Sequence, residues 1–288
     1  MPPPPPANMP LGQRLMTLVQ TLQFGWYLCH VILCFCTLRY GLSYITFNYN
    51  SFWAQTSYRI GFVAAATTYG IVVYKSFRAR MRAAGGMPKQ GDILRMAGDE
   101  NVQYFIMALV WLFYRQMPLA LLPFTIYSIF HALTYTRLNL IPTIQPRPVT
   151  TTTSPGKPGA KKSGGPIADA IGDFIKQYYD ASMTMVAAFE ILLWFRVLSS
   201  AIMFVKGSWV LLVIYSIFLR ARHNQSSFVQ GAISQGVARG DALVANQSTP
   251  PPVRQIWQTL KGIVKQIADA TDINRYIGSA QPGMKKAS

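Results

Sequence analysis

The first long apolar block of the chain decides the fold class, and over residues 24–47 it reads FGWYLCHVILCFCTLRYGLSYITF. Arg39 is the only charged residue in this block. A helix of this length measures about 36 Å, because each residue adds 1.5 Å along the axis. The hydrocarbon core of a bilayer is about 30 Å thick, so the block is long enough to cross it. The sequence therefore predicts a membrane protein built from helices.

Five further apolar blocks follow, at residues 58–77, 102–114, 117–135, 187–205 and 208–219. Only two residues separate 102–114 from 117–135, and only two separate 187–205 from 208–219, which predicts two tight helical hairpins. The arms 102–114 and 208–219 reach only about 20 Å. These hairpins either stop short of the far surface or span with local thinning of the bilayer. We predict an all-α integral membrane protein with about six helical arms, including two short hairpins, and with additional amphipathic interfacial helices.

Charged residues are scarce and unevenly placed. The chain has 27 Lys and Arg against 10 Asp and Glu, a net charge of +17, and only 13% of its residues are charged. In soluble domains about 25% of the residues are charged, so the low charged fraction excludes an average globular enzyme. The high apolar fraction excludes a disordered chain. With six arms, 22 of the 27 basic residues lie on one side, and the turns on the other hold only Arg59, Arg115 and Lys206. Cytoplasmic connections carry the excess of Lys and Arg, so we expect both termini and both long loops in the cytosol.

The basic residues lie beside apolar blocks and form no nucleic-acid-binding motif, so we expect lipid contact and no nucleic-acid partner. The tripeptides Asn224-Gln225-Ser226 and Asn246-Gln247-Ser248 are acceptors for N-glycosylation. On the expected cytosolic side they should stay unmodified.

The pattern divides the chain into five segments. Residues 1–23 form a proline-rich tail and an interfacial helix, and residues 24–141 form a four-arm membrane unit. Residues 142–166, rich in Pro, Thr, Gly and Lys, are predicted to be a disordered linker. Residues 167–222 hold an amphipathic helix and a two-arm membrane hairpin. Residues 223–288 form a cytosolic tail with an amphipathic helix over 253–277.

The cytosolic tail contains the clearest amphipathic pattern. Apolar residues recur at helical spacing along one face: Val253, Ile256, Trp257, Leu260, Ile263, Val264 and Ile267. The opposite side carries the cations Arg254, Lys261 and Lys265. Such a helix is suited to lying in the plane of an anionic membrane surface, with Trp257 at the headgroup level. A helix that docks on another protein would use the same face, so both alternatives stay open.

Three polar or charged residues, His131, Glu190 and Arg196, lie within apolar blocks. A charge in the hydrocarbon region is energetically costly, so its presence suggests a function. Three functions are possible: a polar contact between arms, an ion or proton relay, or catalysis. Glu190 and Arg196 are six positions apart and do not share a helical face, so we do not expect them to pair directly. We favour structural contacts between arms. The sequence has no phosphate-binding glycine loop, metal-ligand spacing or nucleophile elbow, so no catalytic residue, cofactor or metal is expected.

Several stretches resemble one known family. Residues 100–137 read ENVQYFIMALVWLFYRQMPLALLPFTIYSIFHALTYTR, residues 189–191 read FEI and residues 215–220 read YSIFLR. These stretches are similar to the transmembrane protein 33 family, and the ending Tyr135-Thr136-Arg137 is the most specific element. The proline-rich start, the long linker and the basic tail look more like the fungal members, the pore membrane proteins of the nuclear envelope, than like the shorter animal members.

The resemblance implies a non-enzymatic protein of the endoplasmic reticulum and nuclear envelope that is linked to nuclear pore complex assembly and distribution. It also implies three kinds of partner: curved anionic membrane, nuclear pore components and reticulon-type proteins. A nuclear import receptor is a fourth, which would bind through the 253–267 stripe. We expect a scaffold whose hairpins and in-plane helices add area to the cytosolic leaflet and bend the membrane. The alternatives are a small transporter or lipid-handling enzyme that uses Glu190, His131 and Arg196, and a plain anchor that recruits a soluble partner.

Overall fold

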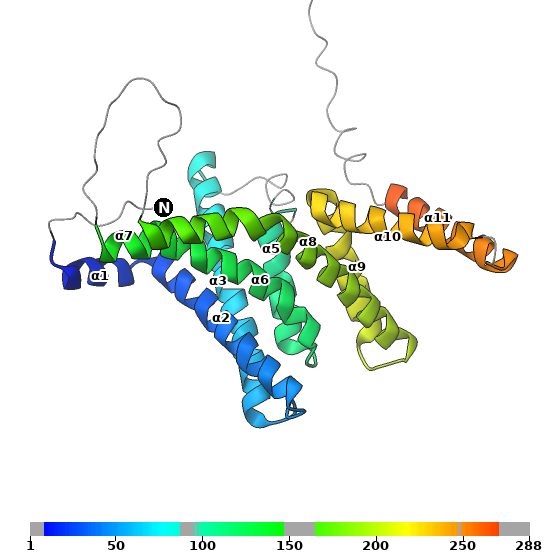
Figure 1. Cartoon of the computed structure of the whole chain (residues 1–288), viewed down its shortest axis with the longest axis horizontal. Helices are drawn as coiled ribbons and strands as arrows, with labels where there is room; N and C mark the ends of the chain where they lie inside the picture. Colours follow the sequence, from blue (N-terminus) through cyan, green and yellow to red (C-terminus); the bar gives the residue numbers. More distant parts are fainter. Residues whose placement is uncertain (1–8, 87–95, 97, 147–164, 247–248, 271–288) are drawn as a thin grey trace, which may run out of the picture. The chain divides into compact units, whose positions relative to one another are not determined.

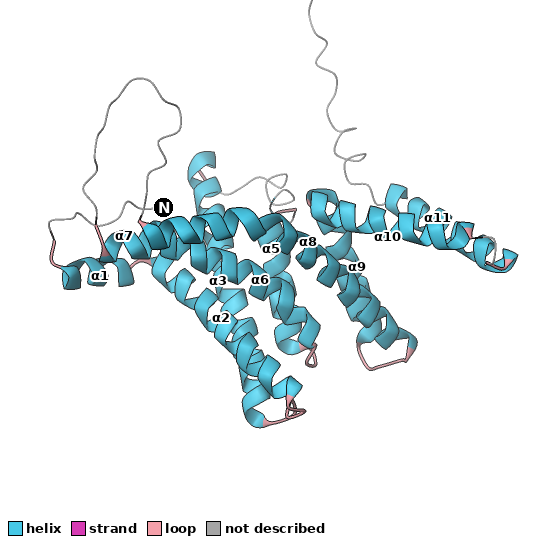
Figure 2. Ribbon diagram, in the orientation of Figure 1, coloured by secondary structure: helices cyan, strands magenta, loops and turns pink. Residues whose placement is uncertain are grey.

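The computed structural model describes residues 9–86, 96, 98–146, 165–246 and 249–270, except for the side chains of Ala84, Ile267, Ala268 and Ala270. Every regular element in these residues is a helix, and no strand occurs among them (Figure 2). The expectation of an all-α membrane protein is therefore confirmed. Two compact units, residues 1–228 and 229–288, divide the chain.

The first unit contains α1 to α9. Its helices are α1 (Leu11–Val19), α2 (Leu22–Ile45), α3 (Phe52–Ala84), α5 (Glu100–Phe113), α6 (Pro118–Tyr135), the π-helical turn η1 (Thr136–Leu140), α7 (Ile141–Ile144), α8 (Pro166–Ile202) and α9 (Ser208–Gln225). The pairs α2–α3, α5–α6 and α8–α9 are helical hairpins, and their three turns lie at the same end of the unit (Figure 1).

Local sequence explains where these helices begin and how they turn. Thr21, Ser51 and Asp99 are N-caps, and the side chain of each accepts a hydrogen bond from a backbone N–H of the first turn, that of Phe24, Ala54 or Asn101. Gly207 lies in the α8–α9 turn with φ +76°, a conformation that glycine adopts without a steric cost. The hairpins are therefore encoded at their caps and turns as well as in their apolar runs.

Four helical stretches are long and apolar enough to cross a membrane: Leu22–Ile45, Phe52–Ala83, Pro118–Ile144 and Pro166–Ile202. α5 has 14 residues and is shorter than a span. α9 has 18 residues, but its last two turns carry Arg220, Arg222 and His223. Both short arms of the sequence analysis thus form helices, while the number of crossings stays a prediction.

Two predicted segments extend differently from their expected bounds. The amphipathic stripe after residue 166 and the fifth arm are one continuous helix, α8, which has 37 residues. The helical path of the third span continues past residue 141 through α7 and ends at Ile144. Thr143 in α7 is buried, and its carbonyl accepts a hydrogen bond of 2.7 Å from Arg14 in α1. This bond fastens the N-terminal amphipathic helix to the end of the four-arm unit. Residues 147–164 of the expected linker lie outside the described residues.

The core of the first unit is built around close helix approaches and aromatic rings. At Gly61 in α3, a methyl group would lie 3.4 Å from Leu121 of α6, 3.5 Å from Leu33 and 3.6 Å from Cys36 of α2. Small residues at such points let helix backbones approach closely inside a membrane. Van der Waals packing drives helix association there, because the surrounding lipid removes the hydrophobic driving force. Beside this point, Phe62 and Phe124 pack edge to face with their ring centroids 5.5 Å apart.

Replacing Gly61 by leucine is expected to lower the stability of the purified full-length chain in detergent by about 1–3 kcal/mol, because the added atoms overlap three neighbouring side chains. Gly25→Leu in α2 is the control, since a methyl group placed there has no atom of another helix within 4 Å. Thermal unfolding followed by circular dichroism measures both variants. Equal melting temperatures for the two would contradict the packing described here.

Candidate functional sites

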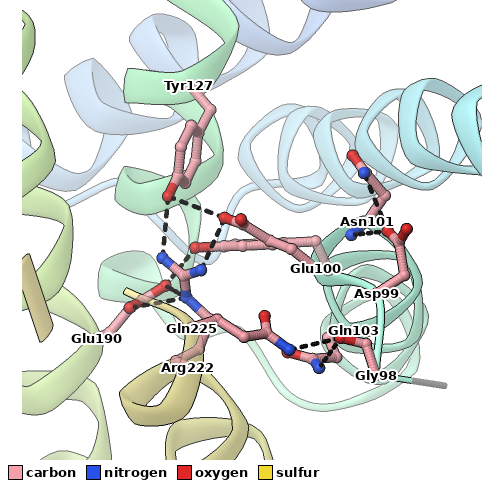
Figure 3. A network of polar contacts seen from close by, with 10 residues as sticks. Gly98, Asp99, Glu100, Asn101, Gln103, Tyr127, Glu190, Arg222 and Gln225 are labelled. Carbon is pink, nitrogen blue, oxygen red and sulfur yellow. Dashed lines mark hydrogen bonds and ion pairs between the residues drawn. The ribbon is translucent and has the colours of Figure 1, made fainter. Parts of the chain in front are cut away.

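A buried ionic cluster centred on Arg222 joins four helices of the first unit (Figure 3). The guanidinium of Arg222, near the end of α9, lies 2.7 Å from Glu100 Oε1 at the start of α5. Its Nε lies 3.2 and 3.3 Å from the two carboxylate oxygens of Glu190 in α8, and its Nη2 donates to the Tyr127 hydroxyl of α6 at 3.0 Å. The hydroxyl of Tyr104 in α5 donates to Glu190. Each guanidinium nitrogen of Arg222 therefore contacts a carboxylate or a hydroxyl group.

The burial of this cluster decides what it does. Only 3% of Arg222 and 1% of Glu190 is exposed, whereas Glu100 is nearly half exposed. A buried charge persists only when it is paired and hydrogen-bonded. Because both carboxylates and the Tyr127 hydroxyl contact one guanidinium, and the Tyr104 hydroxyl donates to Glu190, the cluster fixes α5, α6, α8 and α9 relative to one another.

The other two polar residues singled out in the sequence lie elsewhere. The His131 ring lies 5.0 Å from that of His30 and 5.2 Å from that of Trp26, and His30 Nδ1 lies 2.8 Å from Ser128 Oγ. Arg196 donates to Ser200 one turn along α8 at 2.5 Å. The structure therefore does not bring His131, Glu190 and Arg196 together, and it pairs Glu190 with a basic residue of another arm.

A cavity of about 460 Å³ opens beside the ionic cluster and is lined in part by Glu100, Tyr127, His131 and Arg222. Its charged groups are already engaged with one another, as described above. Within the described residues, no group of three or more His, Cys, Asp or Glu side chains is placed to hold a metal ion. The arrangement is that of a polar contact between helices.

Arg222 is the residue of this cluster that the sequence-based predictions missed. It lies three residues beyond the sixth apolar block, among the basic residues assigned to the cytosolic tail. A signal was available, because α9 continues to Gln225 and an arginine one turn past an apolar run can reach back to a buried carboxylate. The length of α9 was not evident from hydropathy alone.

The motif Tyr135-Thr136-Arg137 is a packing device. Tyr135 is buried and stacks on Tyr27 of α2 with ring centroids 4.6 Å apart. The guanidinium of Arg137 lies against Gly172 of α8, where a methyl group would come within 2.6 Å of it. The motif thus connects the end of α6 to both flanking helices.

The second unit contains most of α10 (Ser227–Ala245) together with α11 (Pro251–Ala270). Hydropathy does not reveal α10. Asp241 of α10 accepts a hydrogen bond of 2.7 Å from the indole nitrogen of Trp257 and forms an ion pair of 2.6 Å with Lys261. The ring of Trp257 lies directly against Gly240. Trp257 and Lys261, expected at the membrane surface, are therefore placed against α10.

The bonds from Lys261 and Trp257 hold the pKa of Asp241 below its ordinary value, so Asp241 is charged at neutral pH.

The apolar stripe of α11 remains uncovered in this unit. Its described members are all 46–64% exposed: Val253, Ile256, Leu260, Ile263 and Val264. Ile267 lies in α11, but its side chain is outside the described set. Lys265 is exposed, and Arg254 donates to the Asn246 carbonyl at 2.9 Å. Residues 271–277 of the predicted amphipathic helix also lie outside the described residues. The contacts with α10 thus hold one flank of α11 and leave its apolar face open.

Substituting Arg222 by glutamine is expected to destabilise the full-length chain by about 3 kcal/mol or more, because Glu190 is then buried without a cation. Adding Glu190→Gln to this variant should restore part of the loss, since the only carboxylate then left without Arg222 is the half-exposed Glu100. The matched control is Arg220→Gln, two residues earlier on α9, where the side chain bonds Asn224. Thermal unfolding measures all three variants, and a loss in Arg222→Gln no larger than in Arg220→Gln would contradict the role of the cluster.

Comparisons with known proteins show the family to which the chain belongs. The family described as transmembrane protein 33/nucleoporin POM33 matches residues 6–270. The chain is 49% identical to nucleoporin POM33 of Chaetomium thermophilum, over all of this chain and 99% of that protein. It is 28% identical to the pore membrane protein of 33 kDa of Saccharomyces cerevisiae, over 89% of this chain and 88% of the relative.

A further relative is tetra-spanning protein 1 of Schizosaccharomyces pombe, 31% identical over 94% of this chain and 91% of the relative. No solved structure matches the chain. The resemblance seen in the sequence is confirmed, and the chain belongs to the transmembrane protein 33/nucleoporin POM33 family.

Proposed function

We propose that the chain is a non-enzymatic membrane scaffold of the nuclear envelope and endoplasmic reticulum, which contributes to the assembly, distribution or stability of nuclear pore complexes. Relatives named as a nucleoporin and as pore membrane proteins support the location. A further relative, from Saccharomyces cerevisiae, is named pore and endoplasmic reticulum protein of 33 kDa. Four candidate spans supply the membrane anchorage.

The observation that carries the proposal is the exposed apolar stripe of α11. Five apolar side chains lie open along one face of a helix that also carries Arg254, Lys261 and Lys265. A helix of this kind buries its apolar face about 5–10 Å into the boundary between headgroups and acyl chains. Inserted on the cytosolic side, it adds area to that leaflet and favours bending toward it.

The hairpins add to the same effect. α5 is about 21 Å long at 1.5 Å per residue, shorter than the hydrocarbon layer. Held beside α6 and α8 by the Arg222 cluster, α5 and α9 occupy more area in the leaflet near the long loops than in the opposite one. The excess of Lys and Arg in the long loops supports a cytosolic position for that leaflet and for both termini.

The proposed partners rest on this arrangement and on the family resemblance. The exposed stripe makes anionic, curved membrane the proposed partner of α11, whereas nuclear pore components and reticulon-type proteins are the partners that the resemblance implies for the membrane unit. A nuclear import receptor is a further candidate for the tail. The alternative of a transporter or lipid-handling enzyme requires Glu190, His131 and Arg196 to act together, and Glu190 is instead engaged by Arg222 and Tyr104.

Charging the apolar stripe tests the proposal. In the full-length chain, Ile256→Asp with Ile263→Asp is expected to release α11 from anionic bilayers, with each substitution weakening its membrane affinity on the order of tenfold. Site-specific fluorescence at α11 in proteoliposomes reports its insertion, and imaging of the tagged chain in cells reports its distribution at the nuclear rim.

The matched control is Gln258→Asp with Gln266→Asp, which adds the same charge outside the stripe, on exposed side chains. The control should retain insertion and a punctate nuclear rim. Unchanged insertion and rim signal in the Ile256/Ile263 variant would overturn the membrane role of α11. Loss of function in Glu190→Gln, with membrane shape and protein stability unchanged, would favour the transporter or enzyme instead.

A further inference from the structure

A second cavity lies at the opposite end of the first unit from the Arg222 cluster, next to the α2–α3 and α5–α6 turns. Its volume is about 920 Å³, and its lining includes three arginines, Arg59 of α3, Arg115 of the α5–α6 turn and Arg196 of α8. No acidic residue is among the residues that line it. Three cations from distant parts of the sequence therefore converge on one space.

The charge of these arginines is not balanced by the protein. None of the ion pairs among the described residues involves Arg59, Arg115 or Arg196. Arg59 donates through Nη1 to the carbonyls of Leu112 and Tyr114, the latter at 2.7 Å, at the end of α5. Those carbonyls carry only partial negative charge.

The other two arginines are less constrained. Arg196 donates through Nη1 to Ser200 Oγ and its remaining donors have no partner among the described residues. Arg115 is exposed and has no hydrogen-bond or ion-pair partner in the described part of the chain. Several guanidinium donors therefore remain available to an incoming anion.

The rest of the lining identifies the kind of anion. Ile45, Leu119 and Leu122 give the cavity an apolar wall, and Gln116 and Asn50 add amide groups near the turns. Arg196 lies six residues before the end of α8, about 9 Å along its axis, which is within reach of the headgroup region for a long side chain. A ligand with an anionic head and an apolar tail matches both parts of the lining.

We propose that this cavity binds an anionic phospholipid from the leaflet that surrounds the three turns, with its phosphate held by Arg115, Arg196 and Arg59. Guanidinium groups match phosphate oxygens in a bidentate manner, which distinguishes this contact from a general attraction to charge. The acyl chain lies along the apolar wall. This proposal is independent of the proposed function of the chain.

The test uses the full-length chain in detergent micelles supplied with equal amounts of phosphatidylinositol and phosphatidylcholine, and native mass spectrometry counts the retained lipids. Phosphatidylinositol should be retained preferentially, because its net charge offsets the arginines. Arg115→Gln and Arg196→Gln should each reduce its occupancy on the order of tenfold. Melting temperatures measured in parallel show whether the variants are folded, and Arg196→Lys, which keeps the charge but not the fork, should give an intermediate loss.

Lys206→Gln is the matched control, since Lys206 is an exposed cation in the α8–α9 turn at the same end of the unit and does not line the cavity. It should leave occupancy unchanged. Equal retention of the two lipids, or an equal loss in Lys206→Gln and Arg115→Gln, would overturn the site. Displacement of the lipid by millimolar inorganic phosphate would show that the cavity binds free phosphate, and would overturn the assignment to a lipid.

Discussion

A bilayer interior holds no water, so each charged side chain there must find a partner or stay at the edge, and this constraint orders the described helices of the first unit. At one end of the first unit the constraint is met internally, where Arg222 is enclosed by Glu190, Glu100 and two tyrosines. At the other end Arg59, Arg115 and Arg196 satisfy the constraint by lying near the three turns, at the edge of the bilayer. The cluster at Arg222 also explains how α5 and α9, which are poor spans by themselves, remain fixed to α6 and α8. Packing then completes the unit at points such as Gly61.

The fold class and the hairpins could be read from the sequence because they rest on local properties. Apolar runs, their spacing and the two-residue gaps at 115–116 and 206–207 indicate helices and tight turns directly. Glu190 could be recognised as a residue that needs a partner, since its cost in an apolar block is independent of the fold. The identity of that partner is a tertiary fact, because it depends on α9 continuing past the end of the apolar run to carry Arg222 inward.

The second unit shows the same division between local and tertiary information. The apolar stripe of α11 follows from residue spacing, and the structure leaves its described members exposed. The role of Trp257 does not follow from spacing, because its indole is bound by Asp241 and lies on Gly240 of a helix that hydropathy did not reveal. With Trp257 and Lys261 engaged by α10, the side chains left for a membrane are the aliphatic ones and the exposed cations Arg254 and Lys265. This gives α11 a fixed flank and an open face, which suits an element that meets a bilayer as part of a preformed hairpin.

We propose that the three hairpins enter the membrane from the cytosolic side and leave the basic connections behind. The most direct test is labelling by a membrane-impermeant maleimide in sealed microsomes, applied to full-length chains that lack Cys29, Cys34 and Cys36. One chain carries Gln145→Cys beside the long loop and the other Lys206→Cys in the α8–α9 turn. Gln145→Cys should be labelled from outside, and Lys206→Cys should be protected from the reagent until the membrane is opened. Protection of Gln145→Cys in intact microsomes would contradict the topology, and the proposal of membrane bending would fail with it.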